Sequence, residues 1–204
     1  MASPLFDNLH LYLSRKIQDP VSAAGDSGTA STSDRTDYLN RANRFIQTVL
    51  WTKDLGPDFP IISKYLQGLI GASSFTFSTS GTAIPSDYSY PLWVDGTQRL
   101  FFKEPSWWSR VLSDDARMYH SMFTVFTNKV YATYGGAALS SGTGVLYYVK
   151  SDQRASNGDS ADIGIDSIWY DVLVALAASF YFQDRGNTQF VVQDPAKLVL
   201  SVVG

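Results

Sequence analysis

Histidine, the residue most often used for acid–base catalysis near neutral pH, occurs twice in this chain, as His10 and His120. His10 lies in a stretch with helical spacing, and His120 lies just before a predicted strand. A Ser-His-Asp arrangement remains open from residue order alone, but the sequence has no GxSxG-type nucleophile elbow. We therefore expect structural roles for both histidines and no catalytic residue.

Carboxylates that could bind a cation cluster in one polar segment near residues 151–166. They are Asp152, Asp159, Asp162 and Asp166. A calcium loop needs ligands at alternate positions, a glycine and a closing glutamate, and SDQRASNGDSAD meets neither the spacing nor the glutamate requirement. Cysteine is absent, which excludes disulfides, thiolate nucleophiles and zinc–thiolate sites. We expect a solvated loop with a helix N-cap, and neither a metal nor another cofactor.

Two further stretches have residue types that bind ligands in other proteins. GGAALSSGTG, residues 135–144, is glycine-rich, but it lacks the lysine of a phosphate-binding loop and lies between predicted strands. The adjacent Trp107 and Trp108 could stack on sugars or bases. Neighbouring aromatic residues in a strand-rich region more often divide into one core residue and one interface residue.

Arg41 and Arg44 lie three residues apart on the polar face of a predicted helix, residues 33–51, with sequence SDRTDYLNRANRFIQTVLW. Asp37 is one helical turn from Arg41, so a local ion pair is one interpretation. Contact of both arginines with a partner chain is the other.

Composition indicates a packed protein with a lightly charged surface. Hydrophobic residues make up 45% of the chain and aromatic residues 14%, whereas charged residues make up only 17%. Such a surface favours assembly. The net charge of −3 gives no basic footprint for nucleic acid or an anionic membrane. The longest apolar run, 168–182, is too short to span a bilayer and contains Asp171. We expect a soluble protein made in a cytoplasm, without a signal peptide.

Hydrophobic spacing predicts helices over residues 3–18 and 33–51, with a polar loop at 21–34, and a shorter helix in DFPIISKYLQGLIG, residues 58–71, that ends at Gly68 or Gly71. Residues 166–186 form a further helix that is apolar nearly all round. Such a helix is buried on every side, so it is either the centre of a helical layer or a wall shared with a neighbouring subunit. The tail from Thr188 ends in a short apolar segment that needs a docking surface.

Between residues 72 and 151 the pattern changes to short aromatic or β-branched runs separated by turn residues. These runs predict strands at 73–79, 90–94, 99–104, 122–127, 129–134 and 144–150. Asp95-Gly96 predicts a two-residue hairpin turn, Asn128 another turn, and residues 105–115 a short helix crossing the sheet. We predict one α+β domain over residues 1–204. It has a helical bundle lobe of residues 1–71 and 166–204 and an inserted antiparallel β lobe of residues 72–165.

Four motifs occur in a distinctive order: LNRANRFIQTVLW (39–51), YSYPLWVDGTQRLFF (88–102), VLYYVKSD (145–152) and IWYDVLVALAASFYFQDRGN (168–187). This order resembles the head-to-tail adaptor proteins of tailed phages, the family that includes tail tubular protein A of short-tailed phages. In that family an "LNRA" helix ends in Trp, and the sheet begins at a "Y-x-LP"-like motif. A "Y-Y" strand then precedes a polar loop, an Asp and a long Ala-rich helix with an acidic-Arg end. The resemblance covers about residues 33–190, and YPLW departs from the usual Leu-Pro step.

The resemblance implies a structural virion protein rather than an enzyme. It implies a homo-oligomeric ring of twelve subunits beneath the portal, which extends the DNA channel and gives the tail a platform. The expected partners are the portal protein, a tail or nozzle protein, and double-stranded DNA that passes without specific binding, with no membrane. The expected location is the head–tail junction of the virion, and the host cytoplasm during assembly.

On this hypothesis the apolar tail docks on the portal and the 135–144 tip contacts the tail side. The candidate residues in the tail are Phe190, Val192, Leu198 and Leu200. Two alternatives remain. One is another virion component, such as a carbohydrate-binding tail protein that uses Trp107 and Trp108. The other is an enzyme with an unrecognised site.

Overall fold

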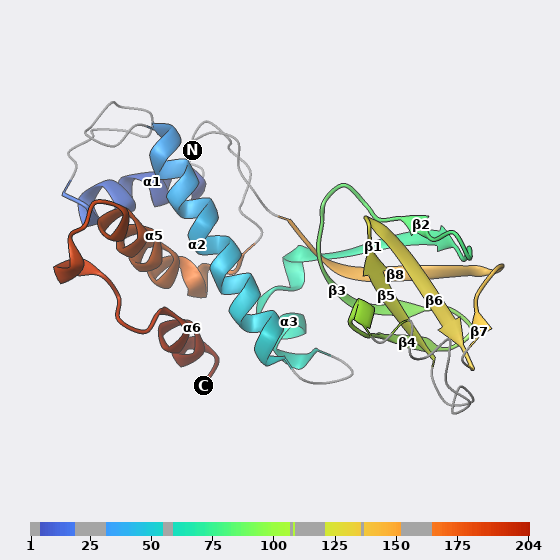
Figure 1. Cartoon of the computed structure of the whole chain (residues 1–204). Coiled ribbons are helices and arrows are strands. Elements are labelled where there is room, and N and C mark those ends of the chain that lie inside the picture. The colour runs from blue at the N-terminus through green and yellow to red at the C-terminus, as the bar shows by residue number, and fades with distance from the viewer. Residues whose placement is uncertain are drawn as a thin grey trace. The chain divides into compact units, whose positions relative to one another are not determined.

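The computed structural model describes residues 5–18, 32–54, 59–106, 108, 121–135, 137–151 and 165–204. The chain divides into two compact units (Figure 1). The helical unit comprises Met1–Leu69 and Asp152–Gly204, and the sheet unit comprises Ile70–Ser151. The single domain predicted for residues 1–204 stays a prediction.

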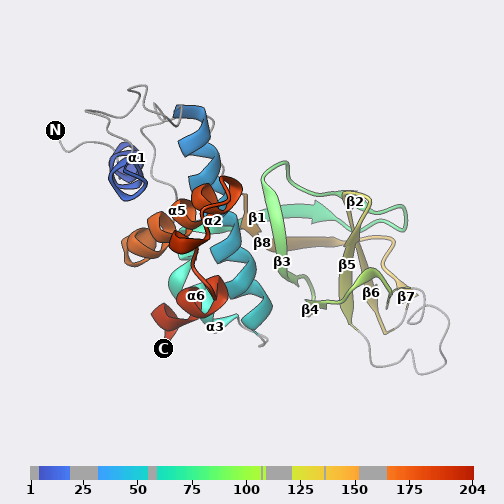
Figure 2. The same cartoon turned by 60° about the vertical axis from the view of Figure 1, so that its left-hand side comes forward.

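The described part of the helical unit contains five α-helices and three single 3-10 turns. The α-helices are α1 (Leu5–Lys16), α2 (Thr32–Lys53), α3 (Pro60–Tyr65), α5 (Tyr170–Asp184) and α6 (Pro195–Val203), and the turns are η1 (Gln67–Leu69), η3 (Ser167–Trp169) and η4 (Thr188–Phe190). Figures 1 and 2 show α2 and α5 side by side. The helix predicted for residues 33–51 is confirmed as α2.

Helix α5 is the centre of the helical unit. It packs against α1, α2 and α6, and nine of its residues from Val172 to Tyr181 are buried. A helix covered on several sides needs apolar residues all round, which explains its composition. The helix therefore lies at the centre of a helical layer, and the alternative of a wall shared with a neighbouring subunit stays a prediction.

The C-terminal segment docks on its own chain. Pro195 occupies the first turn of α6, and the Asp194 carboxylate accepts a hydrogen bond from Lys197 N at 2.9 Å, which caps the helix. Val199 is fully buried, and α6 packs on α2 and α5. Before the helix, Val192 N donates to Ser179 Oγ at 2.9 Å. Part of the apolar surface expected to dock on a portal is thus used within the subunit.

The sheet unit contains eight strands in the described part of the chain. They are β1 (Ile70–Thr76), β2 (Thr82–Ala83), β3 (Tyr88–Asp95), β4 (Arg99–Phe102), β5 (Met122–Phe126), β6 (Lys129–Tyr134), β7 (Ala137–Ala138) and β8 (Thr143–Lys150). Their order in the sheet is β1-β8-β3-β4-β5-β6-β2, and β7 also pairs with β6. Strands β1 and β8 pair over seven positions, from Ile70 opposite Val149 to Thr76 opposite Thr143.

The predicted fold class, a helical bundle with an inserted antiparallel β lobe, is wrong. The structure is α+β, with five helices among the described residues, but a large curled mixed sheet, a half-barrel, makes up a major part of it. The sheet is mixed because β4 and β5 are parallel, with Phe101 opposite Met122 and Phe102 opposite Phe123. A parallel pair needs a crossover of a dozen or more residues. The connection between the two strands is residues 103–121, and the helix predicted for residues 105–115 lies largely outside the described residues.

The curled sheet encloses its own core. Thr82 Oγ1, on β2 at one end of the strand order, donates to the carbonyl of Thr76 on β1 at the other end, at 2.5 Å. The buried cluster inside consists of Phe77, Val94, Leu100, Phe123, Val130, Ala132, Leu146 and Tyr148. A Cβ on Gly71 would lie 2.5 Å from Tyr148 Cζ, so the ring can cover β1 only because residue 71 is glycine. The half-barrel is therefore filled by side chains.

Two predicted turns differ in outcome. The turn at Asn128 is confirmed: Thr127 and Asn128, both with positive φ (48° and 57°), join Phe126 to its partner Lys129. The two-residue turn at Asp95-Gly96 is wrong, because Asp95 pairs with Arg99 and the connection has three residues, 96–98. The extra residue contributes to the mouth of the half-barrel, described below.

Candidate interaction surface and a cavity at the mouth of the half-barrel

Arg41 on α2 binds a residue at the far end of the chain. Its Nη1 donates to Asp184 Oδ2 at 3.0 Å and to Oδ1 at 3.2 Å, and its guanidinium lies 4.3 Å from the ring centre of Phe180. The local pair with Asp37, which the helical spacing favours, is not the one formed in the described residues. Both partners are close to half exposed, so the pair lies at the surface and joins α2 to α5.

A second residue of α2 reaches the same carboxylate. Burial, followed by the charge and hydrogen bond of Asp184, raises the pKa of Tyr38 above its ordinary value. The Tyr38 ring meets the Tyr181 ring edge-on, with centres 5.7 Å apart. Arg185 lies over the other tyrosine, 4.4 Å from the Tyr181 ring centre. The Asp184 carboxylate thus binds both Arg41 and Tyr38, which also contact the rings of Phe180 and Tyr181.

The aromatic contacts continue along α5 into η4. Phe45 meets Phe180 edge-on at 5.9 Å, and Phe182 stacks at a tilt on Phe190 at 4.9 Å. Phe190 remains 53% exposed. We call this set the Arg41 surface. It consists of the exposed or half-buried Tyr38, Arg41, Phe45, Phe182, Asp184, Arg185 and Phe190, together with the buried rings of Phe180 and Tyr181 that they contact.

The structure also describes most of the other sequence-predicted residues. Arg44 is exposed on α2. Trp107 lies outside the described residues, and Trp108 packs 5.8 Å from the Tyr131 ring within the sheet unit. In the tail, Val192 is half-buried before α6, and Leu198 and Leu200 are half-buried on it. The structure therefore brings Arg41 and Phe190 into the same surface.

His10 has no access to solvent. It is fully buried on α1, with Nε2 3.3 Å from Thr36 Oγ1 of α2, and its carbonyl accepts from Ser14 Oγ at 2.8 Å. Burial, with a smaller contribution from the buried Arg35, lowers the pKa of His10 to about 4. The imidazole is therefore neutral at pH 7. His120 lies outside the described residues.

The described residues show where the predicted carboxylate loop ends. Asp166 caps η3, accepting from Ile168 N at 3.2 Å, whereas Asp152, Asp159 and Asp162 lie outside the described residues. Within the described ranges no three His, Asp or Glu side chains gather as metal ligands. In those same ranges no helix has the length and apolar character needed to cross a membrane.

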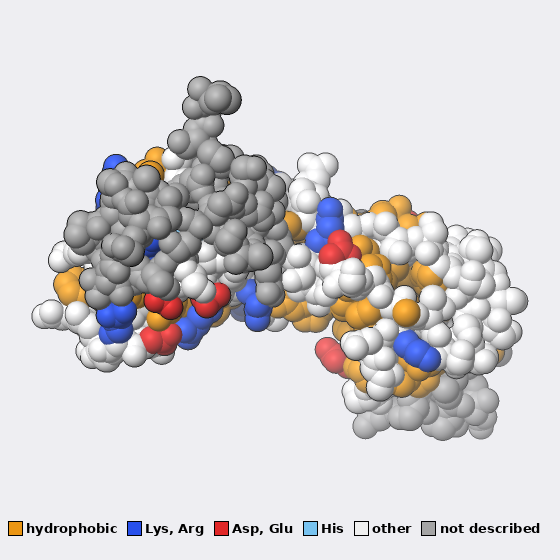
Figure 3. All heavy atoms as spheres, turned by 90° about the horizontal axis from the view of Figure 1, so that it is seen from above, with side chains coloured by type: hydrophobic (Ala, Val, Ile, Leu, Met, Phe, Trp, Pro, Cys, Tyr) orange, Lys and Arg blue, Asp and Glu red, His pale blue; other side chains and the backbone are white. Residues whose placement is uncertain are grey.

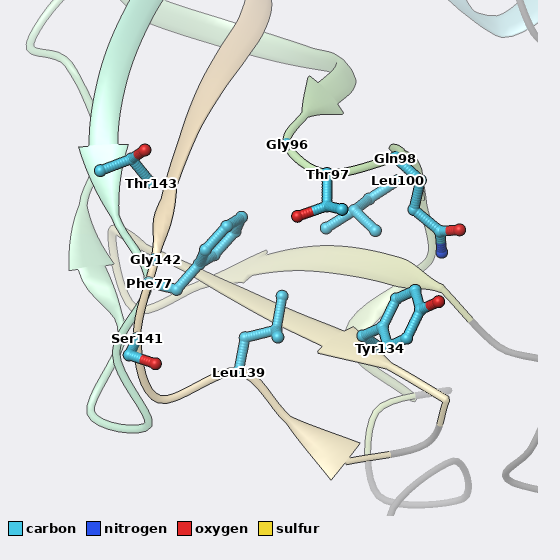
Figure 4. A pocket seen from close by; sticks show the side chains of 10 residues that line it. All are labelled: Phe77, Gly96, Thr97, Gln98, Leu100, Tyr134, Leu139, Ser141, Gly142 and Thr143. Carbon is cyan, nitrogen blue, oxygen red and sulfur yellow. The ribbon is translucent and has the colours of Figure 1, made fainter.

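A cavity of about 260 Å³ lies at one end of the sheet unit, where β1, β3 and β6 end (Figure 4). Figure 4 shows Phe77 and Tyr134 on opposite sides of the hollow, with Leu139 between them and Thr97 facing it. Its lining residues are Phe77, Gly96, Thr97, Gln98, Leu100, Tyr134, Leu139, Ser141, Gly142 and Thr143. None of these is charged. Gln98 is fixed by a hydrogen bond from its Nε2 to Ser121 Oγ.

Most residues of the Arg41 surface and of the cavity were not predicted from the sequence. The "DRG" residues at the end of α5 predict only the end of a helix, and the 135–144 segment is predicted to be a tip that contacts the tail side. A usable signal was present in the second case. Residues 96–98 and 139–143 are uncharged turn segments beside strands with alternating aromatic residues. In Figure 3 hydrophobic side chains gather over the sheet unit, with isolated charged groups among them.

Comparison with models of known protein families found no match, and comparison with curated protein sequences found none either.

Proposed function

We propose that this chain is a structural protein of a tailed-phage virion, a head-to-tail adaptor that assembles into a ring beneath the portal. The observation that carries the proposal is the Arg41 surface. Arg41 belongs to the LNRA motif, and Phe180, Asp184 and Arg185 belong to the FYFQDRGN end of the last motif. Two of the four motifs behind the resemblance thus meet in space, although 143 residues separate Arg41 from Asp184.

The chemistry of the Arg41 surface favours contact with another protein. Aromatic residues and arginine are enriched where protein interfaces are strongest. An ion pair this exposed contributes on the order of 0–1 kcal/mol to folding, so stability of the subunit does not explain the arrangement. Placing Arg41 between a carboxylate and a ring does orient its remaining N–H donors, which is an advantage at an interface.

A ring also requires a second, different surface on each subunit. In the proposed assembly twelve subunits surround the DNA channel, with the portal on one side and a tail or nozzle protein on the other. The net charge of −3 suits a channel wall past which DNA slides without specific binding. The protein would be located at the head–tail junction of the virion.

The proposal is tested by the mass of the purified chain in solution and by negative-stain imaging. We expect closed rings for the wild type and association at least about tenfold weaker for Arg41→Ala, because the interface loses its oriented guanidinium. Lys53→Ala removes another exposed cation from the same helix and should associate like the wild type. Thermal unfolding checks that each variant is folded.

Either of two results would overturn the proposal. One is a wild-type chain that remains monomeric at every concentration. The other is a folded Arg41→Ala variant whose rings are as stable as those of the wild type.

A further inference from the structure

The cavity at the mouth of the half-barrel has the size and lining for one uncharged side chain. Its volume of about 260 Å³ is below the roughly 300 Å³ at which cavities begin to take drug-sized ligands. Aromatic rings of Phe77 and Tyr134 flank it, and Leu100 and Leu139 complete the apolar lining. No charged residue lines it, so a charged group entering it would lose its hydration without compensation.

Three large hydrophobic residues of the helical unit are exposed in the described part of the chain: Tyr12, Ile168 and Phe190. Tyr12 precedes Arg15 and Lys16 on the same helical face, and Ile168 lies between Asp166 and Asp171. Inserting either would bring charges to the uncharged rim. Phe190, in contrast, lies in the eight-residue run GNTQFVVQ, residues 186–193, which contains no charge; its ring contacts Phe182, and the charged Asp184 and Arg185 of the Arg41 surface precede the run. It also lies on the single turn η4 rather than inside a helix.

We propose that the cavity at the mouth of the half-barrel receives Phe190 from a second copy of this chain. This inference rests on the proposed ring and supplies its second surface. The exposed Phe190 and the cavity are different surfaces of the subunit. Each subunit therefore inserts its Phe190 into one neighbour and receives the Phe190 of the other neighbour, which is the heterologous contact that closes a ring. A phenylalanine ring entering between Phe77 and Tyr134 meets aromatic faces and edges at van der Waals distance. The polar rim of Thr97, Ser141 and Thr143 stays with solvent or with the incoming backbone.

The absence of cysteine from the chain gives a direct test. In a Phe190→Cys, Leu139→Cys double variant every disulfide must join introduced thiols. Under mild oxidation we expect a ladder of covalent multimers that ends at the ring, because each intermolecular 190–139 disulfide leaves one thiol at either end for the next copy, whereas the single variants reveal any 190–190 or 139–139 disulfides. Ile168→Cys with Leu139→Cys is the matched control and should give no ladder. Each single variant can form dimers at most.

A second measurement uses chains without new thiols. Phe190→Ala should weaken association at least about tenfold, whereas Ile168→Ala removes an equally exposed side chain and should leave association unchanged.

The outcomes separate this inference from the proposed function. Rings without a ladder, or rings of Phe190→Ala as stable as those of the wild type, would overturn the inference and leave the adaptor proposal in place. A disulfide closed within one chain, seen as a monomer that migrates faster without reductant, would also overturn it. A wild-type chain that never associates would overturn both.

Discussion

At the scale of single residues, His10 makes the stability of the helical unit depend on pH. Its pKa is about 4 in the folded chain and about 6.5 when exposed. Above pH 6.5 the imidazole is neutral in both states. As pH falls from 6.5 towards 4, the unfolded chain binds a proton that the folded chain does not. The free energy of unfolding should therefore fall by up to about 3 kcal/mol over this interval.

Denaturant unfolding at a series of pH values from neutral to about 4.5 measures this effect. In His10→Gln the slope of stability against pH should be reduced by the contribution of one histidine, whatever the variant's stability at pH 7. His120→Gln is the matched control. If His10→Gln kept the full wild-type slope, the low pKa assigned to His10 would be wrong.

Residue identity alone marked Arg41 as a candidate but left its partner open. Local spacing favoured Asp37, one turn away, whereas the structure pairs Arg41 with Asp184. Helical spacing describes only neighbours along one helix. Which residue of another helix approaches depends on how α2 and α5 pack, and the sequence carries no short-range signal for that. The same reason explains why Phe180 and Arg185 were not predicted as its companions.

At the scale of elements, α6 is part of the core of the helical unit rather than a free tail. Val199 is fully buried where α6 packs on α2 and α5. Val199→Ala should reduce the free energy of unfolding by about 1–3 kcal/mol, because it removes buried methyl groups and leaves a cavity. Val203→Ala, on the last turn of the same helix and only half-buried, should cost clearly less.

Denaturant unfolding of both variants gives the comparison. Equal and small losses would mean that α6 does not contribute to the core and is available as a whole for docking on a partner.

Some elements of the fold are determined by the residues of a single short stretch of sequence, and others are not. Helices α2 and α5 follow from apolar spacing and composition over a single stretch, and the turn at Thr127-Asn128 follows from two residues. The parallel pairing of β4 and β5 does not, because 19 residues separate the strands and no pattern within either one specifies the direction of its neighbour. Because of this parallel pair the sheet is mixed, whereas the sequence predicted an antiparallel lobe. The same pairing also placed residues 96–98 at the rim of a cavity.

At the scale of the whole molecule, the sheet unit begins and ends at one place. Ile70, its first residue, pairs with Val149, and Ser151 N donates to the carbonyl of Asp87 beside β3. The unit has its own buried cluster and its own strand pairings throughout. An insertion with adjacent ends and an independent core meets the physical requirements of a separately folding unit.

We therefore expect a fragment of residues 70–151 to fold alone and to unfold in one cooperative transition. The β1–β8 pairing that closes the fragment is complete within it, and the aromatic core around Phe123 and Tyr148 needs no residue from outside. The amides of β8 and β3 should be the most protected from hydrogen exchange, because these strands are paired on both sides. Circular dichroism and exchange measured on the fragment and on the intact chain give the comparison. A fragment without cooperative unfolding, or one in which β8 exchanges at the rate of an unfolded peptide, would show that the half-barrel depends on the helical unit for its stability.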